Sequence, residues 1–366
     1  MKKYNVIGVM SGTSLDGLDL AYCTFGKRNK KNTTTNSFSG EWEYKIHQAK
    51  TLRYSSYWKN KLMYAHKLSS QKLTLFDREY GYFIGEEIKK FILQNHLHPN
   101  FVSSHGHTIF HQPEKKVTLQ IGNGATISEV CGLPVVCDFR TGDVALGGQG
   151  APLVPIADKL LFSEYTFCLN LGGFANISYD NKKRNRVAFD ICPANIVLNY
   201  LSSLAGKEFD RDGKMAARGK INLSLFNKLN SISFYKKEPP KSLGREWVEK
   251  NIFPILNSHK IPIKDKLCTF CEHIAFQISK IINLPHTTHH SLILVTGGGA
   301  LNKFLMKRII KNGKIKIKIP EQKIIKYKEA VAFSFLGVLR IRNEINILKS
   351  VTGAERDSIG GTLYET

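Results

Sequence analysis

Three glycine-rich turns, each directly after a short apolar run, are the features of this sequence best suited to chemistry. They occupy residues 12–19, 172–173 and 297–299. Glycine lets a backbone approach a phosphate group closely and present its N–H groups, and a helix that follows adds partial positive charge. Each turn alone is also consistent with an ordinary hairpin or strand-to-helix connection, but three together favour phosphate binding. Because the Walker A and G-x-G-x-x-G patterns are both absent, a nucleotide would need a different architecture.

Two charged residues stand where strands are expected to end. Asp190 precedes Pro193, which suits the first position of a helix, so its carboxylate should lie beside a helix N-terminus and stay ionised, ready to accept a proton. The same position suits a simple helix cap. Arg140 could hold a carboxylate or phosphate with its planar guanidinium, or form a surface ion pair with Asp138 or Asp143. Asp143 is also the second candidate for a proton acceptor.

Two further motifs resemble metal or redox sites. His105, His107 and His111 have metal-like spacing, and an H-x-H pair on a strand should place both rings on one face. No acidic or cysteine residue lies close enough in sequence to complete an obvious zinc site. Cys268 and Cys271 form a C-x-x-C pair inside a helical pattern, where two thiols facing the core are expected.

The elements that must position these residues follow the same pattern twice. The first set comprises strands near 4–9, 18–25 and 41–48, a helical stretch over 57–96, and short strands near 101–105, 118–121 and 134–137. The second set comprises strands at 167–171, 176–179 and 187–190, two helical segments, and a strand at 291–296. Alternating apolar patterns predict the strands and a 3.6-residue period predicts the helices. This repeated arrangement predicts two α/β lobes that hold a ligand between them.

The composition indicates a folded chain with reduced cysteines. The 366 residues are 42% hydrophobic, carry a net charge of +23, and include seven cysteines. No apolar run is long enough to cross a membrane, and the start does not resemble a signal peptide, so a cytoplasmic protein with no membrane partner is expected. The basic residues are spread along the whole chain, so the charge indicates no specific nucleic-acid partner.

Several longer motifs resemble one family, in order along nearly the whole chain. They are MSGTSLDGLD at 10–19, SHGHT at 104–108, TLQIG at 118–122, VCDFR at 136–140, ALGGQGAPLVP at 145–155, NLGG at 170–173, PKSLGRE at 240–246, TGGG at 296–299 and SVTGA at 350–354. Together they resemble the anhydro-N-acetylmuramic acid kinases, a family of the actin, heat-shock ATPase and sugar kinase superfamily.

The resemblance implies a two-lobed actin-like ATPase (ribonuclease H-like) fold with duplicated βββαβαβα lobes and an interlobe cleft. The N-terminal lobe is expected at residues 1–140, with 345–366 packing back on it, and the C-terminal lobe at 141–344. The implied activity uses ATP and Mg²⁺ to open 1,6-anhydro-N-acetylmuramic acid with water and to phosphorylate its 6-oxygen, in peptidoglycan recycling. Two alternatives are a kinase for another sugar and a non-catalytic, nucleotide-gated regulator that binds nucleic acid. A small-molecule sugar partner and a possible homodimer complete these expectations.

The resemblance also assigns roles to individual residues. Asp190 is implied as the catalytic base. The nucleotide-binding residues are implied to be Gly12, Thr13, Ser14, Leu15, Asp16, Gly17, Leu18, Asp19, Gly172, Gly173, Gly297, Gly298 and Gly299. The substrate-binding residues are implied to be His105, Thr108, Arg140 and Asn195. Because Met10 replaces the acidic residue usual in the superfamily, the metal ligands stay open, with Asp16 or Asp19 as candidates.

Two departures from the commoner family wording concern the sugar. The run Thr-Gly-Pro-Gly-Asn is Ile191-Cys192-Pro193-Ala194-Asn195 here, which removes two glycines and puts contacts around Cys192 in doubt. His107 stands where glutamine is usual. An imidazole can still donate or accept a hydrogen bond, so the sugar contact is expected to survive with altered pH dependence.

Overall fold

The computed structural model describes residues 2–12, 14–28, 41–283, 291–313 and 316–365. The chain divides into two compact units, Met1–Ser163 with Tyr327–Thr366, and Glu164–Lys326. The first unit therefore extends beyond the predicted boundary at 140, and the chain returns to it earlier than the predicted 345. Helix α5 (Pro155–Leu161) packs against β3 (Trp42–Arg53), and α12 (Gln322–Ile341) covers the first sheet, which accounts for the difference.

The first unit is built on a seven-stranded sheet. Its strands lie in the order β12 (Thr362–Tyr364), β6 (Val135–Cys137), β4 (Phe101–Gln112), β1 (Lys3–Ser11), β2 (Gly17–Lys27) and β3, with β5 (Val117–Ile121) paired to β4. Its other helices are α1 (Ser56–Tyr64), α2 (Ser70–Asn95), α3 (Gly124–Cys131), α4 (Thr141–Ala145) and α13 (Lys349–Thr352). β1, β2 and β3 are antiparallel, whereas β1, β4 and β6 run parallel.

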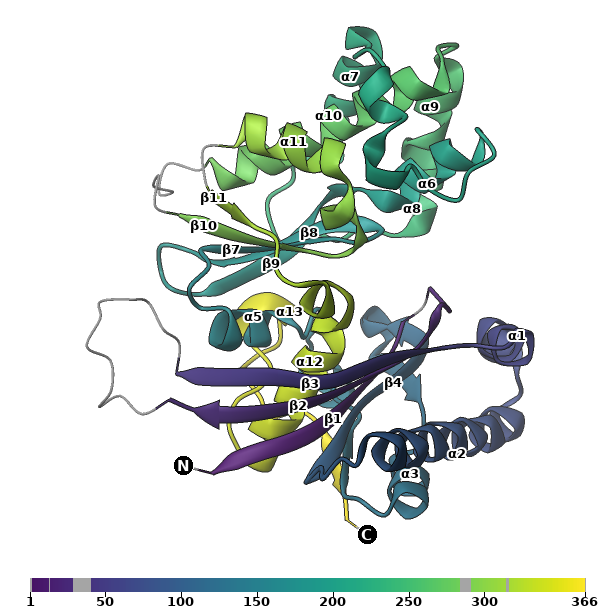
Figure 1. Cartoon of the computed structure of the whole chain (residues 1–366), viewed down its shortest axis with the longest axis vertical. Coiled ribbons are helices and arrows are strands. Elements are labelled where there is room, and N and C mark those ends of the chain that lie inside the picture. The colour runs from purple at the N-terminus through teal and green to yellow at the C-terminus, as the bar shows by residue number, and fades with distance from the viewer. Residues whose placement is uncertain (1, 13, 29–40, 284–290, 314–315, 366) are drawn as a thin grey trace. The chain divides into compact units, whose positions relative to one another are not determined.

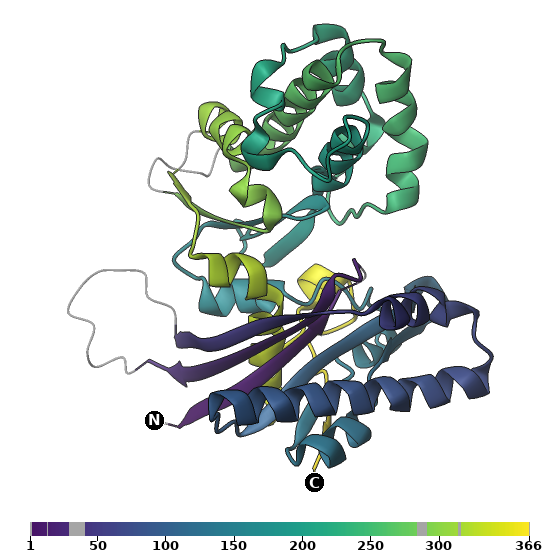
Figure 2. The ribbon, with the colours of Figure 1, turned by 45° about the vertical axis from the view of Figure 1, so that its right-hand side comes forward.

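Helices cover both faces of this sheet, with α2 and α3 on one face and α12 on the other (Figures 1 and 2). Ile7 and Val9 face α2, where they and the α2 residues Tyr80 and Ile84 are completely buried in one core. On the other face α12 comes so close to β1 that a Cβ at Gly8 would lie 2.1 Å from the Ala330 carbonyl oxygen. A strand buried on both faces explains why the run from Val6 to Val9 is continuously apolar.

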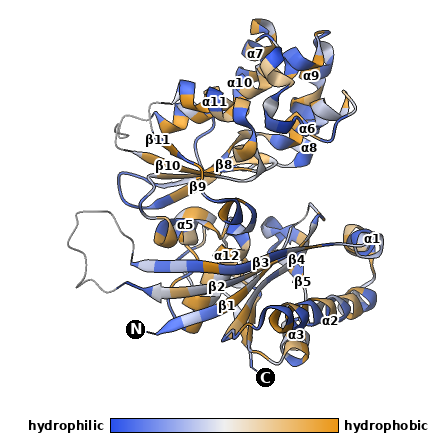
Figure 3. Cartoon of the chain, viewed as in Figure 1, coloured by the Kyte–Doolittle hydropathy of each residue, from blue (hydrophilic) through white to orange (hydrophobic). Residues whose placement is uncertain are grey.

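The single predicted helical stretch over 57–96 divides into α1, a short 3₁₀ turn (Ala65–Lys67) and α2. Helix α1 is capped by Ser55, whose side chain accepts a hydrogen bond from the amide of Trp58. Helix α2 alternates hydrophilic and hydrophobic patches along its length, as expected for a helix with one face on a sheet (Figure 3). Within the described residues no helix is long and apolar enough to cross a membrane.

The second unit contains a five-stranded sheet. Its strands lie in the order β11 (Lys316–Lys318), β10 (Leu292–Thr296), β7 (Phe167–Leu171), β8 (Phe174–Asp180) and β9 (Arg186–Pro193). Its helices are α6 (Asn195–Ser203), α7 (Leu223–Asn230), α8 (Arg245–Asn251), α9 (Phe253–Ser258), α10 (Ile263–Ile282) and α11 (Lys303–Asn312). Cys268 and Cys271 are both buried on α10, as the helical pattern predicted.

The two sheets share one strand order. Three antiparallel strands open each unit, and two further strands are then added in parallel beside the first, as β3-β2-β1-β4-β6 and as β9-β8-β7-β10-β11. This duplicated α/β arrangement confirms the predicted actin-like fold class.

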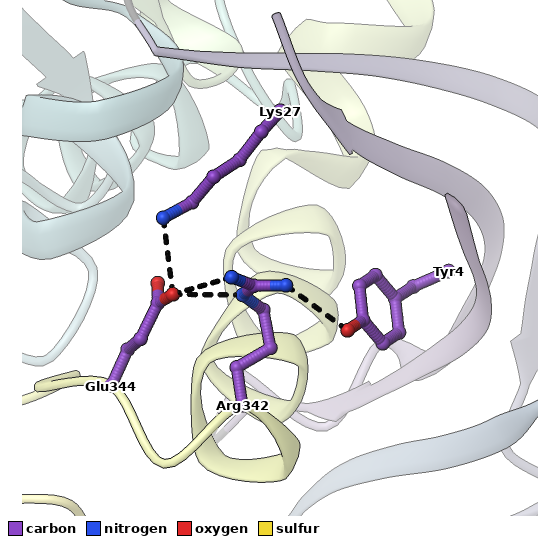
Figure 4. A network of polar contacts seen from close by, with 4 residues as sticks. All are labelled: Tyr4, Lys27, Arg342 and Glu344. Carbon is purple, nitrogen blue, oxygen red and sulfur yellow. Dashed lines mark hydrogen bonds and ion pairs between the residues drawn. The ribbon is translucent and has the colours of Figure 1, made fainter. Parts of the chain in front are cut away.

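The end of α12 is tied to the first hairpin by a network of four residues (Figure 4). Glu344 accepts from Lys27 at 3.0 Å and from Arg342 at 2.7 Å, and Arg342 also donates to the Tyr4 hydroxyl at 3.1 Å. Just beyond it, the fully buried Asn346 side chain bonds three backbone groups of α12 and the C-terminal segment. These contacts hold the C-terminal segment on the first unit.

Candidate functional site

The first glycine turn closes the hairpin between β1 and β2. The amide of Leu15 donates to the Gly12 carbonyl at 3.2 Å, and Leu15 adopts a left-handed backbone conformation with φ 58°. Ser14 and Asp16 are exposed at this tip, while Thr13 lies outside the described residues. The tip therefore offers accessible polar groups directly after a buried strand.

The far side of the same turn is held by its neighbours in the sheet. A Cβ at Gly17 would lie 2.4 Å from the Leu52 carbonyl oxygen, so only glycine lets β2 approach β3 here. Leu18 is completely buried in the core. Asp19 accepts a hydrogen bond from the Thr51 hydroxyl at 2.6 Å. Gly17 and Leu18 therefore have structural roles, because they pack against β3 and the core and hold the turn in place.

Arg140 binds His105 in the first unit. Its guanidinium lies 2.8 Å and 3.1 Å from His105 Nε2 and donates to the Gly150 carbonyl at 2.8 Å. His105 Nδ1 donates to the Gly106 carbonyl at 2.9 Å, so Nε2 is the acceptor. Burial and the nearby Arg140 charge lower the His105 pKa to about 3. The ring is therefore neutral and helps to orient the guanidinium.

The two aspartates near Arg140 make other bonds. Asp138 accepts from the Thr141 hydroxyl at 2.6 Å. Asp143 is fully buried and accepts from the Gly150 amide and the Thr352 hydroxyl, both at 2.7 Å. A carboxylate enclosed in this way holds the loop together and is poorly placed to take a proton from a ligand.

A polar pocket of about 160 Å³ opens beside His105. Its lining includes the carboxylates of Asp77 and Asp138, the Thr118 hydroxyl and the Gln120 amide. Gln120 Oε1 is buried and has no hydrogen-bond partner within the described residues. Groups of these types recognise hydroxyl and amide groups of small polar ligands.

A β-bulge in β4 separates the predicted histidine pair. Val9 pairs with Ser104 but Ser11 pairs with His107, so β4 has one extra residue, and Gly106 at φ 72° lies within the irregularity. A bulge reverses the alternation of side chains. His105 consequently packs on Phe333 of α12, with ring centroids 4.5 Å apart, whereas His107 lies on the α2 side near Tyr80.

The expectation that both rings share one face is therefore wrong. Within the described residues no group of three or more histidine, cysteine or acidic side chains is arranged to hold a metal ion. Thr108, the next predicted sugar contact, follows His107 and is partly exposed.

A chain of buried hydroxyl groups leads from α2 to His107. The hydroxyl groups of Tyr80 and Tyr54 lie 2.6 Å apart, those of Tyr54 and Ser11 lie 2.7 Å apart, and Ser11 Oγ lies 2.8 Å from His107 Nδ1. Ser11 directly precedes Gly12. Sequence reasoning missed both tyrosines, since only the helical period of α2 marked Tyr80, as an ordinary core residue.

In the second unit, helix α6 begins against the Gly172–Gly173 turn. The amides of Ala194, Asn195 and Ile196 donate to the two glycine carbonyls at 2.8, 3.1 and 3.2 Å. The carbonyl groups of the turn therefore point to the helix. The Gly173 amide has no hydrogen-bond partner in the part of the chain that the structure describes, so it is available to an anion.

The third glycine turn packs on the end of β7, where Asn195 also lies. Asn195 Nδ2 donates to the Leu171 carbonyl at 3.0 Å. A Cβ at Gly297, where φ is 80°, would lie 2.7 Å from the same oxygen, and one at Gly299 would lie 3.3 Å from Asn195 Oδ1. Gly298 opens the 3₁₀ turn that precedes α11. The structure thus brings both glycine turns of this unit together around Asn195.

Asp190 lies on β9 at a second β-bulge, at the end of the sheet that also carries the two glycine turns of this unit. Strand β9 continues to Pro193 and α6 begins at Asn195, so Asp190 does not end its strand as predicted. Ala175 pairs with Cys192 but Asn176 with Asp190, which leaves Ile191 as the extra residue. The predicted position of Pro193 at the first turn of the helix is therefore wrong.

The loop after α7 holds the Asp190 carboxyl. Asp190 Oδ2 accepts from the Leu243 amide at 2.8 Å, and the Asp190 amide donates to the Lys241 carbonyl at 3.1 Å. Burial raises the Asp190 pKa to about 6, more than the Leu243 hydrogen bond lowers it. The carboxyl is therefore mostly ionised near neutral pH, as expected, but its pKa is raised by burial and not held down by a helix N-terminus. Leu243 is a contact that sequence reasoning missed, although it lies in the PKSLGRE motif.

Cys192, the main departure from the family wording, is fully buried in the core of the second unit. Burial raises the pKa of its thiol. The Cys192 side chain therefore packs against apolar neighbours. Any effect of this replacement on sugar contacts would act through the backbone of the bulge at Ile191.

Comparison with known proteins identifies what this chain is similar to. A family model described as anhydro-N-acetylmuramic acid kinase matches residues 4–366. A relative of that name from Mannheimia succiniciproducens is 34% identical, with 100% of this chain and 99% of the relative covered. Another from Sulfurimonas denitrificans is 32% identical, with 98% and 99% covered. A solved structure of component A of the Acidaminococcus fermentans (R)-2-hydroxyglutaryl-CoA dehydratase matches at 10% identity and a TM-score of 0.45, with 90% of this chain and 96% of that chain covered.

Proposed function

This chain belongs to the anhydro-N-acetylmuramic acid kinase family, and from that membership we propose that it converts 1,6-anhydro-N-acetylmuramic acid, ATP and water into N-acetylmuramic acid 6-phosphate and ADP. The chain is a kinase, so it transfers a phosphoryl group to a sugar alcohol. The family match over nearly the whole chain is the observation that carries the reaction. We further propose that the reaction serves peptidoglycan recycling in the cytoplasm, and the possible homodimer stays a prediction.

The proposed chemistry couples two bond changes. Water attacks C1 of the sugar, the bond from C1 to O6 breaks, and O6 attacks the γ-phosphorus while ADP leaves. The water gives one proton to a base and keeps the other as part of the new hydroxyl group on C1. A positioned general base contributes about 10²–10⁴ in rate. The remaining acceleration comes from positioning and from stabilising the charge of the phosphoryl group.

We assign Asp190 as this base. A pKa of about 6 is close to neutral pH, where a base combines a useful fraction of ionised form with real proton affinity. One carboxylate oxygen is fixed by the Leu243 amide at 2.8 Å, and no other hydrogen bond to this carboxyl is made within the described residues. The arrangement supports a base that is oriented by one oxygen and reacts through the other.

The glycine turns are proposed to bind the phosphate groups of ATP. The free amide of Gly173 and the close packing of Gly297 and Gly299 support this role. Asp16 or Asp19 is proposed as the protein ligand of a magnesium ion, because Mg²⁺ prefers carboxylate oxygens and needs few protein ligands when a nucleotide supplies others. When bound, Mg²⁺ would neutralise the charge that develops on the phosphate oxygens.

Sugar contacts are proposed for His105, Thr108, Arg140 and Asn195. Arg140, held by His105 and the Gly150 carbonyl, is a suitable partner for the lactyl carboxylate of muramic acid. The polar pocket beside His105 supports recognition of hydroxyl or amide groups nearby. Asn195, whose Nδ2 already bonds Leu171, would act mainly by fixing the glycine turns.

Turnover in ¹⁸O-labelled water tests the proposal. The purified chain should form the 6-phosphate only when both ATP and the anhydro sugar are present, with the label on C1. Asp190→Asn should lower kcat by about 10²–10⁴, because the amide cannot accept the proton. Mass spectrometry of the product gives both the yield and the position of the label.

Asp180→Asn is the matched control, since Asp180 is an exposed carboxylate at the end of β8 in the same sheet. It should leave kcat unchanged. An Asp190→Asn enzyme with native turnover would show that another group is the base. Turnover of a different anhydro sugar in preference to this one would instead identify the chain as a kinase for another substrate.

A further inference from the structure

The row of hydrogen bonds from Tyr80 to His107 has a definite donor-to-acceptor direction, because the Tyr80 hydroxyl at one end has no acceptor outside this row among the described residues. Tyr80 and Ser11 are 0% and 1% exposed, and Tyr54 is 5% exposed. Within the described residues, the Tyr80 hydroxyl makes one well-formed hydrogen bond, to Tyr54 at 2.6 Å, and its other hydroxyl neighbour, Ser11, belongs to the same row. A buried hydroxyl that cannot donate costs about 1–3 kcal/mol.

This cost decides where each hydrogen lies. If His107 Nδ1 donated to Ser11, the hydrogens would run towards Tyr80, and the hydroxyl of Tyr80 would then accept in its one well-formed hydrogen bond, the 2.6 Å bond to Tyr54, and could not donate in it. The opposite direction satisfies every group: Tyr80 donates to Tyr54, Tyr54 donates to Ser11, and Ser11 donates to Nδ1 of His107. The imidazole nitrogen that faces Ser11 is then an acceptor.

The remaining ring nitrogen of His107 must carry the hydrogen. Burial lowers the His107 pKa to about 4, so the ring is neutral near physiological pH and has a single N–H group. His107 Nε2 makes no hydrogen bond within the described residues. His107 directly precedes Thr108, a proposed sugar contact, and its hydrogen-bond partner Ser11 directly precedes the Gly12 turn.

We propose that Tyr80, Tyr54 and Ser11 fix His107 as the tautomer with its hydrogen on Nε2, and that this N–H group donates to an acceptor oxygen of the bound substrates. The inference rests on the proposed function for the identity of those substrates. The oxygen belongs either to the sugar or to a phosphate of ATP, and the chemistry is the same for both. His107 is then a specificity residue, and the tyrosines and Ser11 are positioning residues.

The same geometry explains how histidine replaces the commoner glutamine. A glutamine amide could accept from Ser11 through its oxygen and donate to the ligand through its nitrogen. A neutral histidine can accept from Ser11 at Nδ1 and donate to the ligand at Nε2 only in one of its two tautomers. The hydroxyl groups of Tyr80, Tyr54 and Ser11 fix that tautomer, so the ring can make the same two hydrogen bonds as a glutamine amide.

The first test reads the tautomer in the ligand-free, full-length protein by ¹⁵N NMR of labelled histidine. His107 should show an acceptor-type Nδ1 and a protonated Nε2. Tyr54→Phe removes the hydroxyl that directs Ser11, so the His107 resonances should move toward a mixture of tautomers. Tyr57→Phe, which removes an exposed hydroxyl outside the chain, should leave them in place. A native ring protonated on Nδ1 would overturn the proposal whatever the enzyme does.

The second test measures binding of the anhydro sugar and of ATP separately by calorimetry, so it does not depend on turnover. His107→Met keeps a similar size but has no N–H group, and it should weaken one of the two ligands about 3- to 10-fold, as expected for one lost neutral hydrogen bond. His107→Gln should restore native affinity. The weakened ligand identifies the source of the oxygen. Unchanged affinity for both ligands in His107→Met would refute the contact.

Discussion

The Asp190 carboxyl binds its proton more tightly than an ordinary aspartate does. Burial outweighs the single hydrogen bond from the Leu243 amide and raises the pKa from 3.8 to about 6. A base works only in its ionised form, so kcat/KM should be constant near neutral pH and should fall about tenfold per pH unit below about pH 6. Initial rates measured at saturating ATP between about pH 4 and pH 8 check this limb.

The same pKa has a consequence for stability that serves as a control. Because the folded carboxyl holds its proton more tightly than the unfolded one, Asp190 stabilises the fold fully only below about pH 4, and this contribution is lost as the pH rises through about 6. A rise from 3.8 to about 6 corresponds to at most about 3 kcal/mol. Asp190→Asn should therefore unfold at higher denaturant concentration than the native chain at pH 7, but not at pH 4. An acid limb placed below about pH 4.5 would mean that another group is titrating.

For single residues, the sequence indicated which side chains were candidates for the site but not the environment in which each side chain lies. Asp190 and Arg140 could be selected because each is a charged residue shortly after an apolar run. The environment of Asp190 depends on Leu243, which is 53 residues away in the chain. Burial, which no local pattern of the sequence reveals, sets the direction of its pKa shift, and the Leu243 hydrogen bond only reduces that shift.

Among the elements, β4 depends on the bulge around Gly106. Gly106 has φ 72°, and a Cβ there would lie 2.5 Å from the Ile121 carbonyl oxygen on β5. Gly106→Ala should lower the free energy of unfolding by more than about 2 kcal/mol, since left-handed strain alone costs roughly 1–2 kcal/mol. It should also weaken binding of the sugar, because His105 and His107 lose their places. Urea unfolding and calorimetry measure the two effects.

Gly132→Ala separates strain from crowding. Gly132 ends α3 with φ 68°, but a Cβ there would meet nothing within 4 Å. It should cost only about 1 kcal/mol and leave sugar affinity unchanged. If Gly106→Ala behaved in the same way as Gly132→Ala, the bulge would not be what positions the histidines.

Strand and helix periods predicted most of the elements but not their irregularities. The apolar runs of β1, β7 and β10 and the helical face of α2 follow directly from the sequence. The bulges in β4 and β9 do not, because each adds one residue without changing the local apolar pattern. The extra residue in β4 puts His105 and His107 on opposite faces of the sheet. Strand β9 continues past its own extra residue, Ile191, to Pro193, so Asp190 does not end the strand.

For the molecule as a whole, Asn346 is the residue that fastens the C-terminal segment to the first unit. Its side chain donates to the Leu336 and Gly360 carbonyls at 3.0 and 2.9 Å, and accepts from the Gly360 amide at 2.7 Å. Asn346→Ala would leave these backbone groups unpaired in a buried site. It should lower the free energy of unfolding by about 3 kcal/mol, as measured by urea denaturation.

An exposed asparagine provides the comparison. Asn227→Ala, on the surface of α7, should change the free energy of unfolding by less than about 0.5 kcal/mol. Equal effects of the two substitutions would show that the C-terminal segment is not held through Asn346. The duplicated fold was predictable from the repeated order of strands and turns, whereas the return of the chain at Tyr327 was not, because α12 runs as one helix across that point.

The first unit is assembled from two stretches of chain with the whole second unit inserted between them. During synthesis on the ribosome, β1 to β4 emerge long before α12, which must cover one face of their sheet. Glu164–Lys326 is the first stretch that can complete its own core as it leaves the exit tunnel. A premature stop before α12 would therefore release a nascent chain with an uncovered apolar sheet, which is a target for chaperones and proteases.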